Sequence, residues 1–329
     1  MNLSTEYLGL QLKNPLMPGA SPLASNLDTA RKLEDAGASA IVMSSLFEEQ
    51  GGSTAKTAPD SGINGGANGG DEDYSPSPDD FQFAPDEYFR HIARLKKVLG
   101  IPVIASLNGV TQGGWTSHAR GIEQAGADAL ELNFYDIPGD GTDSSVDIEV
   151  RAIEMLQAVK ENVKIPVAVK LSPFFTSLPN FASELVDSGA SGLIFFNHFY
   201  QADIDIETLD LIPVLHLADS RELLLRLRWL AIVSASVKTS FAAGGGVYDA
   251  HGALKAIMAG AHVVQMVSVL LKRGPAFLKT ILIELENWLE KHEYESIAEL
   301  RGAMNLKNVR HPGAFERACY IRVLQQWRS

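Results

Sequence analysis

The sequence has a single cysteine, no long basic run and no stretch of about 20 uncharged apolar residues. The lone thiol of Cys319 excludes an internal disulfide, and we expect it to be inert. A formal net charge of −12 disfavours nucleic acid or an anionic membrane surface as the main partner. The most apolar segment, "LLLRLRWLAIV", is broken by Arg226 and Arg228, and the N-terminal segment has no secretory pattern. These absences predict a cytoplasmic protein without a membrane span, and no set of metal ligands stands out.

A repeated pattern of helix, glycine and strand runs along the chain. Hydrophobic residues make up 46% of it, enough for a large core. In four segments an amphipathic helical pattern ends at a glycine, and an apolar strand follows within a few residues: "LEDAGASAIVMSS", "IEQAGADALELNF", "LVDSGASGLIFFN" and "IMAGAHVVQMVS". Two further strands begin after Ile-Pro, at Pro102 and Pro166, where proline is tolerated.

Eight apolar strands are predicted in total, beginning near residues 15, 39, 102, 129, 166, 192, 240 and 262. Helical patterns separate them, and strict alternation of this kind indicates an α/β fold, a (β/α)₈ TIM barrel. We expect residues 1–329 to form a single domain. Three stretches exceed the needs of a barrel: a loop at 46–85 that we interpret as a lid, an excursion at 199–218, and a C-terminal extension at 293–329. The extension ends in a helical pattern that packs on the barrel or on a partner subunit, so a homodimer is left open.

Polar residues follow most of the predicted strands, where barrels of this class keep their active sites. The candidates are Ser21, Ser44, Ser45, Ser106, Asn108, Asn133, Tyr135, Asp136, Lys170, Ser172, Asn197, His198 and Ser268. Gly244–Gly246 and Ser268 follow the last two strands, where barrels often bind phosphate, although a tight turn also explains the glycines. Asn133 and Asn197 suit a planar, amide-rich ligand, or simply satisfy the strand ends.

Lys170 is the most informative of these residues because a buried, unpaired ammonium is costly. Three roles are open: a counter-ion to an anionic cofactor or intermediate, a Schiff-base nucleophile, or a structural partner of Glu131. We favour the first role, in which Lys170 is the counter-ion to an anionic cofactor or intermediate.

The order and spacing of these motifs resemble the dihydroorotate dehydrogenase family over nearly the whole chain. The motifs are "NPLMPGASPLA", "ELN", "VKLSP", "FFN", "GGV" and "AGAHVVQMVS". "IPVIASLNG", "LRWLAIVS" and "GAFERACY" are most similar to the dihydroorotate dehydrogenase-like subgroup. The resemblance implies an FMN-dependent (β/α)₈ oxidoreductase that oxidises a CH–CH bond and passes a hydride to flavin N5.

Site residues implied by the resemblance follow position by position. Lys170 would lie by the flavin N1/C2 carbonyl, and Asn133 and Asn197 would face the substrate. The flavin ring would be lined by Ala20, Ser21, Ser44, Ser106 and Asn133, and its phosphate held by Gly245, Gly246, the backbone of Val267, and Ser268.

Three positions depart from the family pattern. Met43 replaces a lysine beside the flavin, Asp136 stands where the family has its Cys or Ser base, and Pro138 replaces a substrate-binding asparagine. Asp136 is therefore a candidate base or a turn cap, with His198 as the rival base. The substrate is expected to be a small carbonyl- or amide-bearing molecule, and the departures weigh against dihydroorotate itself; the sequence does not identify the electron acceptor. Two other readings stay open: a flavin-free lyase or isomerase of a phosphorylated substrate using Lys170, and a flavin-binding protein without catalysis.

Overall fold

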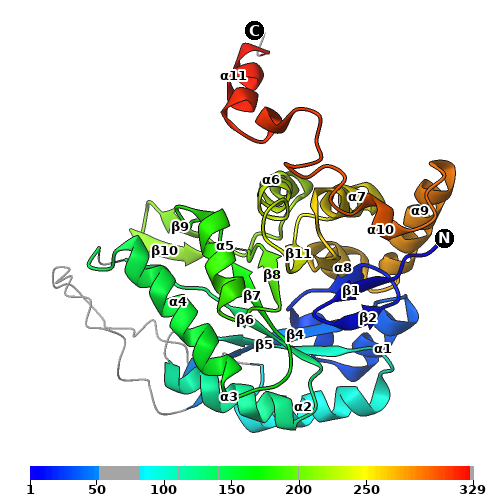
Figure 1. The fold of residues 1–329 in the computed structure, drawn as a ribbon. Helices are drawn as coiled ribbons and strands as arrows, with labels where there is room; N and C mark the ends of the chain where they lie inside the picture. Colours follow the sequence, from blue (N-terminus) through cyan, green and yellow to red (C-terminus); the bar gives the residue numbers. More distant parts are fainter. Residues whose placement is uncertain (52–81, 110–111, 140, 199, 327–329) are drawn as a thin grey trace.

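The computed structural model describes residues 1–51, 82–109, 112–139, 141–198 and 200–326 (Figure 1). Its centre is an eight-stranded parallel sheet in the order β3-β12-β11-β8-β7-β6-β5-β4. The two outer strands also meet, because the backbone N–H of Ser39, just before β4, donates to the carbonyl of Leu16 in β3 at 3.0 Å. The strands are β3 (Leu16–Pro18), β4 (Ile41–Phe47), β5 (Val103–Asn108), β6 (Ala129–Asn133), β7 (Val167–Leu171), β8 (Gly192–Phe195), β11 (Ser240–Gly244) and β12 (Val263–Met266). The predicted (β/α)₈ barrel is confirmed, and every strand begins within two residues of its predicted start.

Helices surround this barrel on its outside (Figure 1). They are α1 (Leu27–Asp35), α2 (Pro85–Val98), α3 (Gln112–Gln124), α4 (Ser145–Lys160), α5 (Leu178–Asp187), α6 (Leu223–Val233), α7 (Ala250–Ala259), α8 (Ser268–Arg273) and α9 (Phe277–Lys291). Local sequence fixes several of their first turns. The Asn26 side chain caps α1, and Ser144 with Asp147 forms a capping box at the start of α4.

The inner face of the barrel has an apolar floor and a polar upper layer. A hairpin of β1 (Thr5–Tyr7) and β2 (Leu10–Leu12), which the sequence did not predict, closes the amino-terminal end. Its Tyr7 and Leu8 pack against inward-facing residues such as Val42 and Ile104. Along β6 the inward positions change from Ala129 to polar side chains two and four residues later. The polar groups therefore gather at the carboxyl ends of the strands.

The three predicted additions have different outcomes. Within 46–85, β4 continues to Phe47, η2 covers Glu48–Gly51, and α2 starts at Pro85. Residues 52–81 of the predicted lid lie outside the described residues. The 199–218 excursion contains a hairpin, β9 (Ala202–Asp205) paired with β10 (Asp210–Pro213).

The C-terminal extension ends in a helix, as predicted. It contains the short α10 (Ile297–Leu300), η5 (Pro312–Ala314) and α11 (Arg317–Gln325). In Figure 1, α11 projects away from the barrel. None of the helices among the described residues is long and apolar enough to cross a membrane.

Candidate active site

A cavity of about 490 Å³ opens at the carboxyl end of the barrel. Eight of the residues predicted from the sequence line it: Ala20, Ser21, Ser44, Ser45, Asn133, Tyr135, Lys170 and Asn197. The others are Phe47, Gln50, Gln82, Phe83, Tyr88 and Tyr200. This is the size of a pocket that takes a cofactor or a small molecule. Apart from Tyr135, the aromatic residues of the lining were not predicted, because most of them come from loops and from α2 rather than from strand ends.

Lys170 lies in a buried polar network below the cavity. Its Nζ is 2.9 Å from Glu131 Oε1 and 3.5 Å from Gln265 Oε1, and Gln265 Nε2 donates to Glu131 Oε2 at 2.7 Å. Lys170 is 7% exposed and Glu131 1%. Since an isolated buried charge is costly, each member of the pair compensates the burial of the other. The Glu131 partnership is thus present, while the ammonium still lines the cavity.

Asn133 and Asn197 meet across the mouth of the barrel. Asn197 Nδ2 donates to Asn133 Oδ1 at 2.8 Å, and the backbone N–H of His198 donates to Asn197 Oδ1 at 2.9 Å. These bonds orient both amides. Asn133 Nδ2 has no acceptor among the residues that the structure describes, so its N–H groups are available for a carbonyl oxygen in the cavity.

Serines of β4 and β5 are held by a buried tyrosine. The Ser45 and Ser106 hydroxyls are 2.8 Å apart, so Ser106 is fully buried behind Ser45 rather than in the cavity lining. The Tyr88 hydroxyl lies within 2.9–3.0 Å of the carbonyls of Ser44 and Ser106. Burial raises the pKa of Tyr88, so this hydroxyl stays a donor. Met43, which the resemblance placed beside the flavin, lies in the core on the other side of β4 and outside the cavity lining.

The glycine loop after β11 does not line the cavity, and it rests on a buried arginine. Gly245 and Gly246 have φ of +84° and +77°, and a Cβ on Gly246 would lie 2.6 Å from the backbone nitrogen of Leu223. Only glycine fits there without displacing the start of α6. The Arg226 side chain, which is 4% exposed, donates through Nε to the carbonyl of Gly244, and its Nη2 lies beside Gly245. Burial lowers the pKa of Arg226, while Glu222 opposes that shift.

Arg226 was missed as a site residue by the sequence analysis, which noted it only as a break in an apolar segment. A charged residue inside an otherwise apolar helix was the available signal. Val267 and Ser268, the other predicted phosphate contacts, lie at the start of α8 and also outside the cavity lining.

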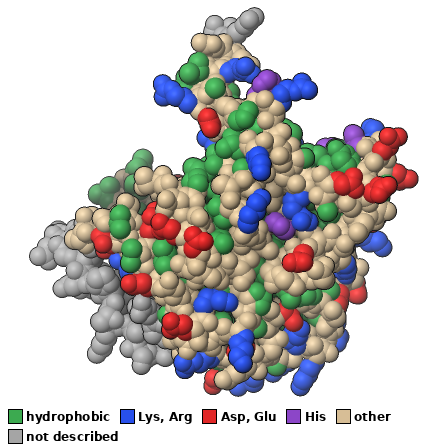
Figure 2. Space-filling view, viewed as in Figure 1, with side chains coloured by type: hydrophobic (Ala, Val, Ile, Leu, Met, Phe, Trp, Pro, Cys, Tyr) green, Lys and Arg blue, Asp and Glu red, His purple; other side chains and the backbone are tan. Residues whose placement is uncertain are grey.

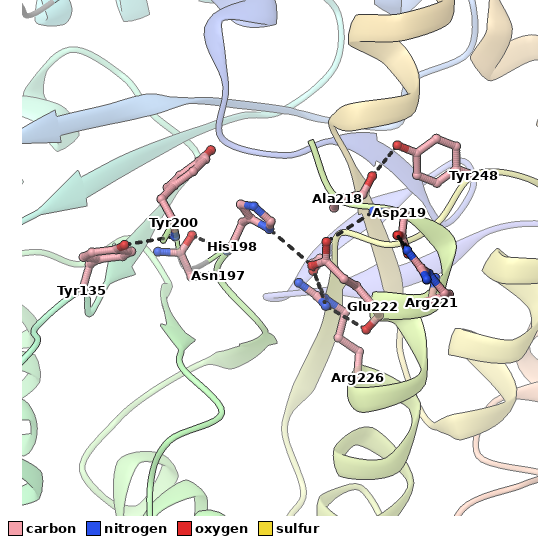
Figure 3. Close-up of polar contacts among 11 residues, drawn as sticks. Tyr135, Asn197, His198, Tyr200, Ala218, Asp219, Arg221, Glu222, Arg226 and Tyr248 are labelled. Atoms are coloured by element: carbon pink, nitrogen blue, oxygen red, sulfur yellow. Dashed lines mark hydrogen bonds and ion pairs between the residues drawn. The ribbon is translucent and has the colours of Figure 1, made fainter. Parts of the chain in front are cut away.

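His198 and Asp136 have partners of their own outside the cavity lining. His198 Nδ1 lies 3.3 Å from Glu222 Oε2, and Figure 3 shows its ring between Asn197 and Glu222. Asp136 is 44% exposed, and its carboxylate is 3.3 Å from the guanidinium of Arg151. The catalytic roles of these two residues stay predictions. Tyr135 does line the cavity, and its hydroxyl accepts a hydrogen bond of 3.2 Å from the backbone N–H of Tyr200.

Comparison with known proteins identifies the class of barrel to which this site belongs. Residues 2–289 match the family model of dihydroorotate dehydrogenase, so the chain belongs to that family.

Individual relatives are oxidoreductases of small molecules. The chain is 26% identical over 314 residues to the catalytic subunit of dihydroorotate dehydrogenase B (NAD(+)) from Thermoplasma acidophilum, covering 92% of this chain and 98% of that protein. It is 31% identical over 217 residues to the corresponding subunit from Methanocella arvoryzae, covering 63% and 66%. The chloroplastic dihydropyrimidine dehydrogenase (NADP(+)) of Arabidopsis thaliana is 22% identical over 325 residues, covering 92% and 76%. The predicted family is confirmed, and an oxidoreductase follows from it.

Proposed function

We propose that residues 1–329 form one FMN-dependent oxidoreductase domain that acts on a CH–CH bond of a small, carbonyl- or amide-bearing substrate. The observation that carries the proposal is the buried Lys170 ammonium, paired with Glu131 and facing a cavity that Asn133 and Asn197 share. Fixed positive charge beside amide donors suits a cofactor ring that gains negative charge on reduction.

The residues present fit FMN at both of its ends. At the ring end, the cavity combines the Lys170 cation with the amide of Asn133 and the hydroxyls of Ser21 and Ser44. At the phosphate end, Gly245 and Gly246 turn at positive φ and pack against the start of α6 and the buried Arg226, and the backbone of such a turn beside a cation suits a phosphate. When bound, FMN supplies a two-electron acceptor that takes a hydride from the substrate.

The other task of the site is to hold or move a proton. Among the described residues that line the cavity, the titratable side chains are Lys170, Tyr88, Tyr135 and Tyr200; no carboxylate, imidazole or thiol is present. Burial raises the pKa of Tyr200, with a contribution from Tyr135. A protonated phenol cannot accept the proton that leaves a substrate carbon on oxidation, but it can donate a proton to that carbon in the reverse direction, reduction of the substrate. Phenols keep their protons at neutral pH, so we favour Tyr135 as the proton donor in that direction, ahead of Asp136 and His198.

The ion pair also bears on the flavin-free alternative. A Schiff-base lysine must lose its proton to become a nucleophile, whereas Lys170 donates to the buried Glu131 carboxylate at 2.9 Å. The ammonium of this pair suits an electrostatic role toward the cofactor, which requires no loss of its proton. The lyase or isomerase reading is accordingly less well supported than the flavin enzyme.

The cofactor is tested first, on the purified protein. Release by heat followed by chromatography is expected to yield FMN; FAD, or failure to bind FMN after reconstitution, would refute the proposal. Dihydroorotate and dihydropyrimidines are then screened anaerobically for bleaching of the flavin band, because the relatives are named for these substrates. Reoxidation by NAD(+), NADP(+) or fumarate identifies the acceptor.

A further inference from the structure

A second cavity, of about 640 Å³, lies at the amino-terminal end of the barrel, opposite the candidate active site. The β1–β2 hairpin forms one wall, and residues at the starts of β8, β11 and β12 form another. In Figure 2, basic and histidine side chains gather around the place that this hairpin occupies in Figure 1. The hydrogen-bond donors among the lining side chains are Ser191, Lys238, Thr239, Ser240, His262 and Arg301.

The guanidinium of Arg301 is positioned by hydrogen bonds and not by a carboxylate. Its Nη2 donates to Thr5 Oγ1 at 2.8 Å, and Thr5 Oγ1 donates in turn to the carbonyl of His262 at 3.1 Å. Its Nε is buried without a partner among the residues that the structure describes. Burial lowers the pKa of Arg301, and a bound anion would reduce this cost to the charged form.

Neutral donors accompany this cation. His262 Nδ1 accepts from the backbone N–H of Phe241 at 3.0 Å, which leaves the imidazole proton on Nε2, where the described part of the chain supplies no acceptor. The Ser240 hydroxyl accepts from the backbone N–H of Leu8 at 3.0 Å, so its own hydrogen is also available. These two residues therefore add N–H and O–H donors to a cavity that Arg301 also lines.

The charge of the lining is positive, although the chain as a whole has a net charge of −12. Lys238 is exposed, and within the described ranges it forms no ion pair. Glu6 is the one acidic lining residue; it accepts from Gln11 at 3.0 Å, and no ion pair joins it to Lys238 or Arg301. A purely structural cluster would pair its cations with carboxylates of the protein, which are in excess. The donors here converge on a cavity instead.

We propose that this cavity binds a small phosphate ester. A phosphate group has a charge of about −1.5 to −2 near pH 7 and three strong acceptor oxygens, which suits two cations and several neutral donors. A carboxylate offers one charge and two oxygens, and so uses fewer of these donors. The cavity has the volume of pockets that hold small organic ligands, so we expect an ester and not free phosphate.

A ligand in this position would join three segments that are distant in the sequence. They are the β1–β2 hairpin, the starts of β11 and β12, and the segment after α10 that contains Arg301. Because binding to the folded state alone stabilises it, the ligand should raise the melting temperature. The proposal depends neither on FMN nor on the substrate of the opposite site.

Calorimetric titration of the full-length protein tests the proposal. The protein is first loaded with FMN and freed of excess cofactor, so that the proposed flavin phosphate site is filled. Inorganic phosphate, glycerol 3-phosphate and AMP are then titrated at constant ionic strength. All three are expected to bind, with the esters at least ~10-fold tighter than phosphate because they also fill the rest of the cavity. Equal affinities would overturn the choice of an ester and leave free phosphate as the ligand.

Variants of the two cations locate the binding, whether or not the protein holds FMN. Lys238→Gln and Arg301→Gln should each weaken binding of the probes at least ~10-fold, because each removes a charge-assisted hydrogen bond. Lys238 is exposed, so its replacement keeps the fold even if Arg301→Gln does not, and circular dichroism checks both. Lys279→Gln, at an exposed position of α9, is the matched control and should leave the affinity unchanged. Failure of all three probes to bind, or binding that Lys238→Gln and a folded Arg301→Gln leave unchanged, would overturn the proposal.

Discussion

Replacement of Lys170 by methionine separates the two roles of this side chain. Methionine keeps most of the apolar stem and removes the charge. Glu131, which is 1% exposed, then retains only the amide of Gln265 at 2.7 Å. Breaking a buried ion pair from one side costs about 3–5 kcal/mol, because the remaining charge has no counter-ion. Lys170→Met should lower the free energy of unfolding of the flavin-free protein by that amount.

The double variant Lys170→Met/Glu131→Gln supplies the control. A neutral glutamine needs no counter-ion and can still hydrogen-bond Gln265, so we expect most of the lost stability to return, to within about 1–2 kcal/mol of wild type. The cation facing the cavity is absent from both variants. Flavin affinity and the rate of flavin reduction should therefore stay low in both, whatever their stability.

Urea unfolding of the flavin-free proteins measures the stability term without the contribution of bound ligand. FMN titration and anaerobic reduction measure the functional term. If the double variant regains both stability and flavin affinity, Lys170 is only a structural partner of Glu131. If Lys170→Met is as stable as wild type, the buried pair described here is wrong.

Three further predictions follow from single sites. Tyr135→Phe should slow oxidation of the reduced flavin by the unsaturated substrate at least ~100-fold, with Asp136→Asn changing it less than about threefold; the reverse pattern would restore Asp136 as the group that transfers the proton. Gly246→Ala should weaken FMN binding, while Gly9→Ala, at the same φ of +77° with open space around its Cβ, should not. Burial, and secondarily Arg301, lower the pKa of His262 from 6.5 to about 4. Neutral His262 therefore stabilises the fold, and this contribution is complete above pH 6.5. Roughly 2–3 kcal/mol of the free energy of unfolding should be lost as the pH falls towards 4, and His262→Asn should not show this loss.

The barrel could be predicted because its signals are local. Glycines 37, 126 and 189 end helices with φ between +93° and +104°, and the strands that follow are buried on both sides. The β1–β2 hairpin was missed because its strands have three residues each, too few for a periodic pattern.

The sequence predicts which residues lie at the strand ends of the site, but it does not predict the contacts that join distant segments. Asn133, Lys170 and Asn197 could be placed because strand ends converge in a barrel. The pairing of Asp136 with Arg151, and of His198 with Glu222, depends on how loops pack against the next helix. The support of the glycine loop by Arg226 likewise depends on where α6 crosses β11. No spacing in the sequence encodes these contacts.

The closed floor of the barrel explains why the charge of Lys170 acts on the cavity. Beneath Glu131 the hairpin places Tyr7, whose hydroxyl is buried without a partner among the described residues and whose pKa is raised by burial and by Glu131. This side of the ion pair is therefore apolar, and the Glu131 carboxylate is the deeper, less exposed member. The ammonium is the member that reaches the cavity, so its field is least screened in that direction. The hairpin closes the floor of the barrel, and the alternation of inward-facing residues places the ammonium nearer the cavity than the carboxylate. The pair is neutral as a whole, but it presents positive charge to the cavity, where the cofactor ring is proposed to bind.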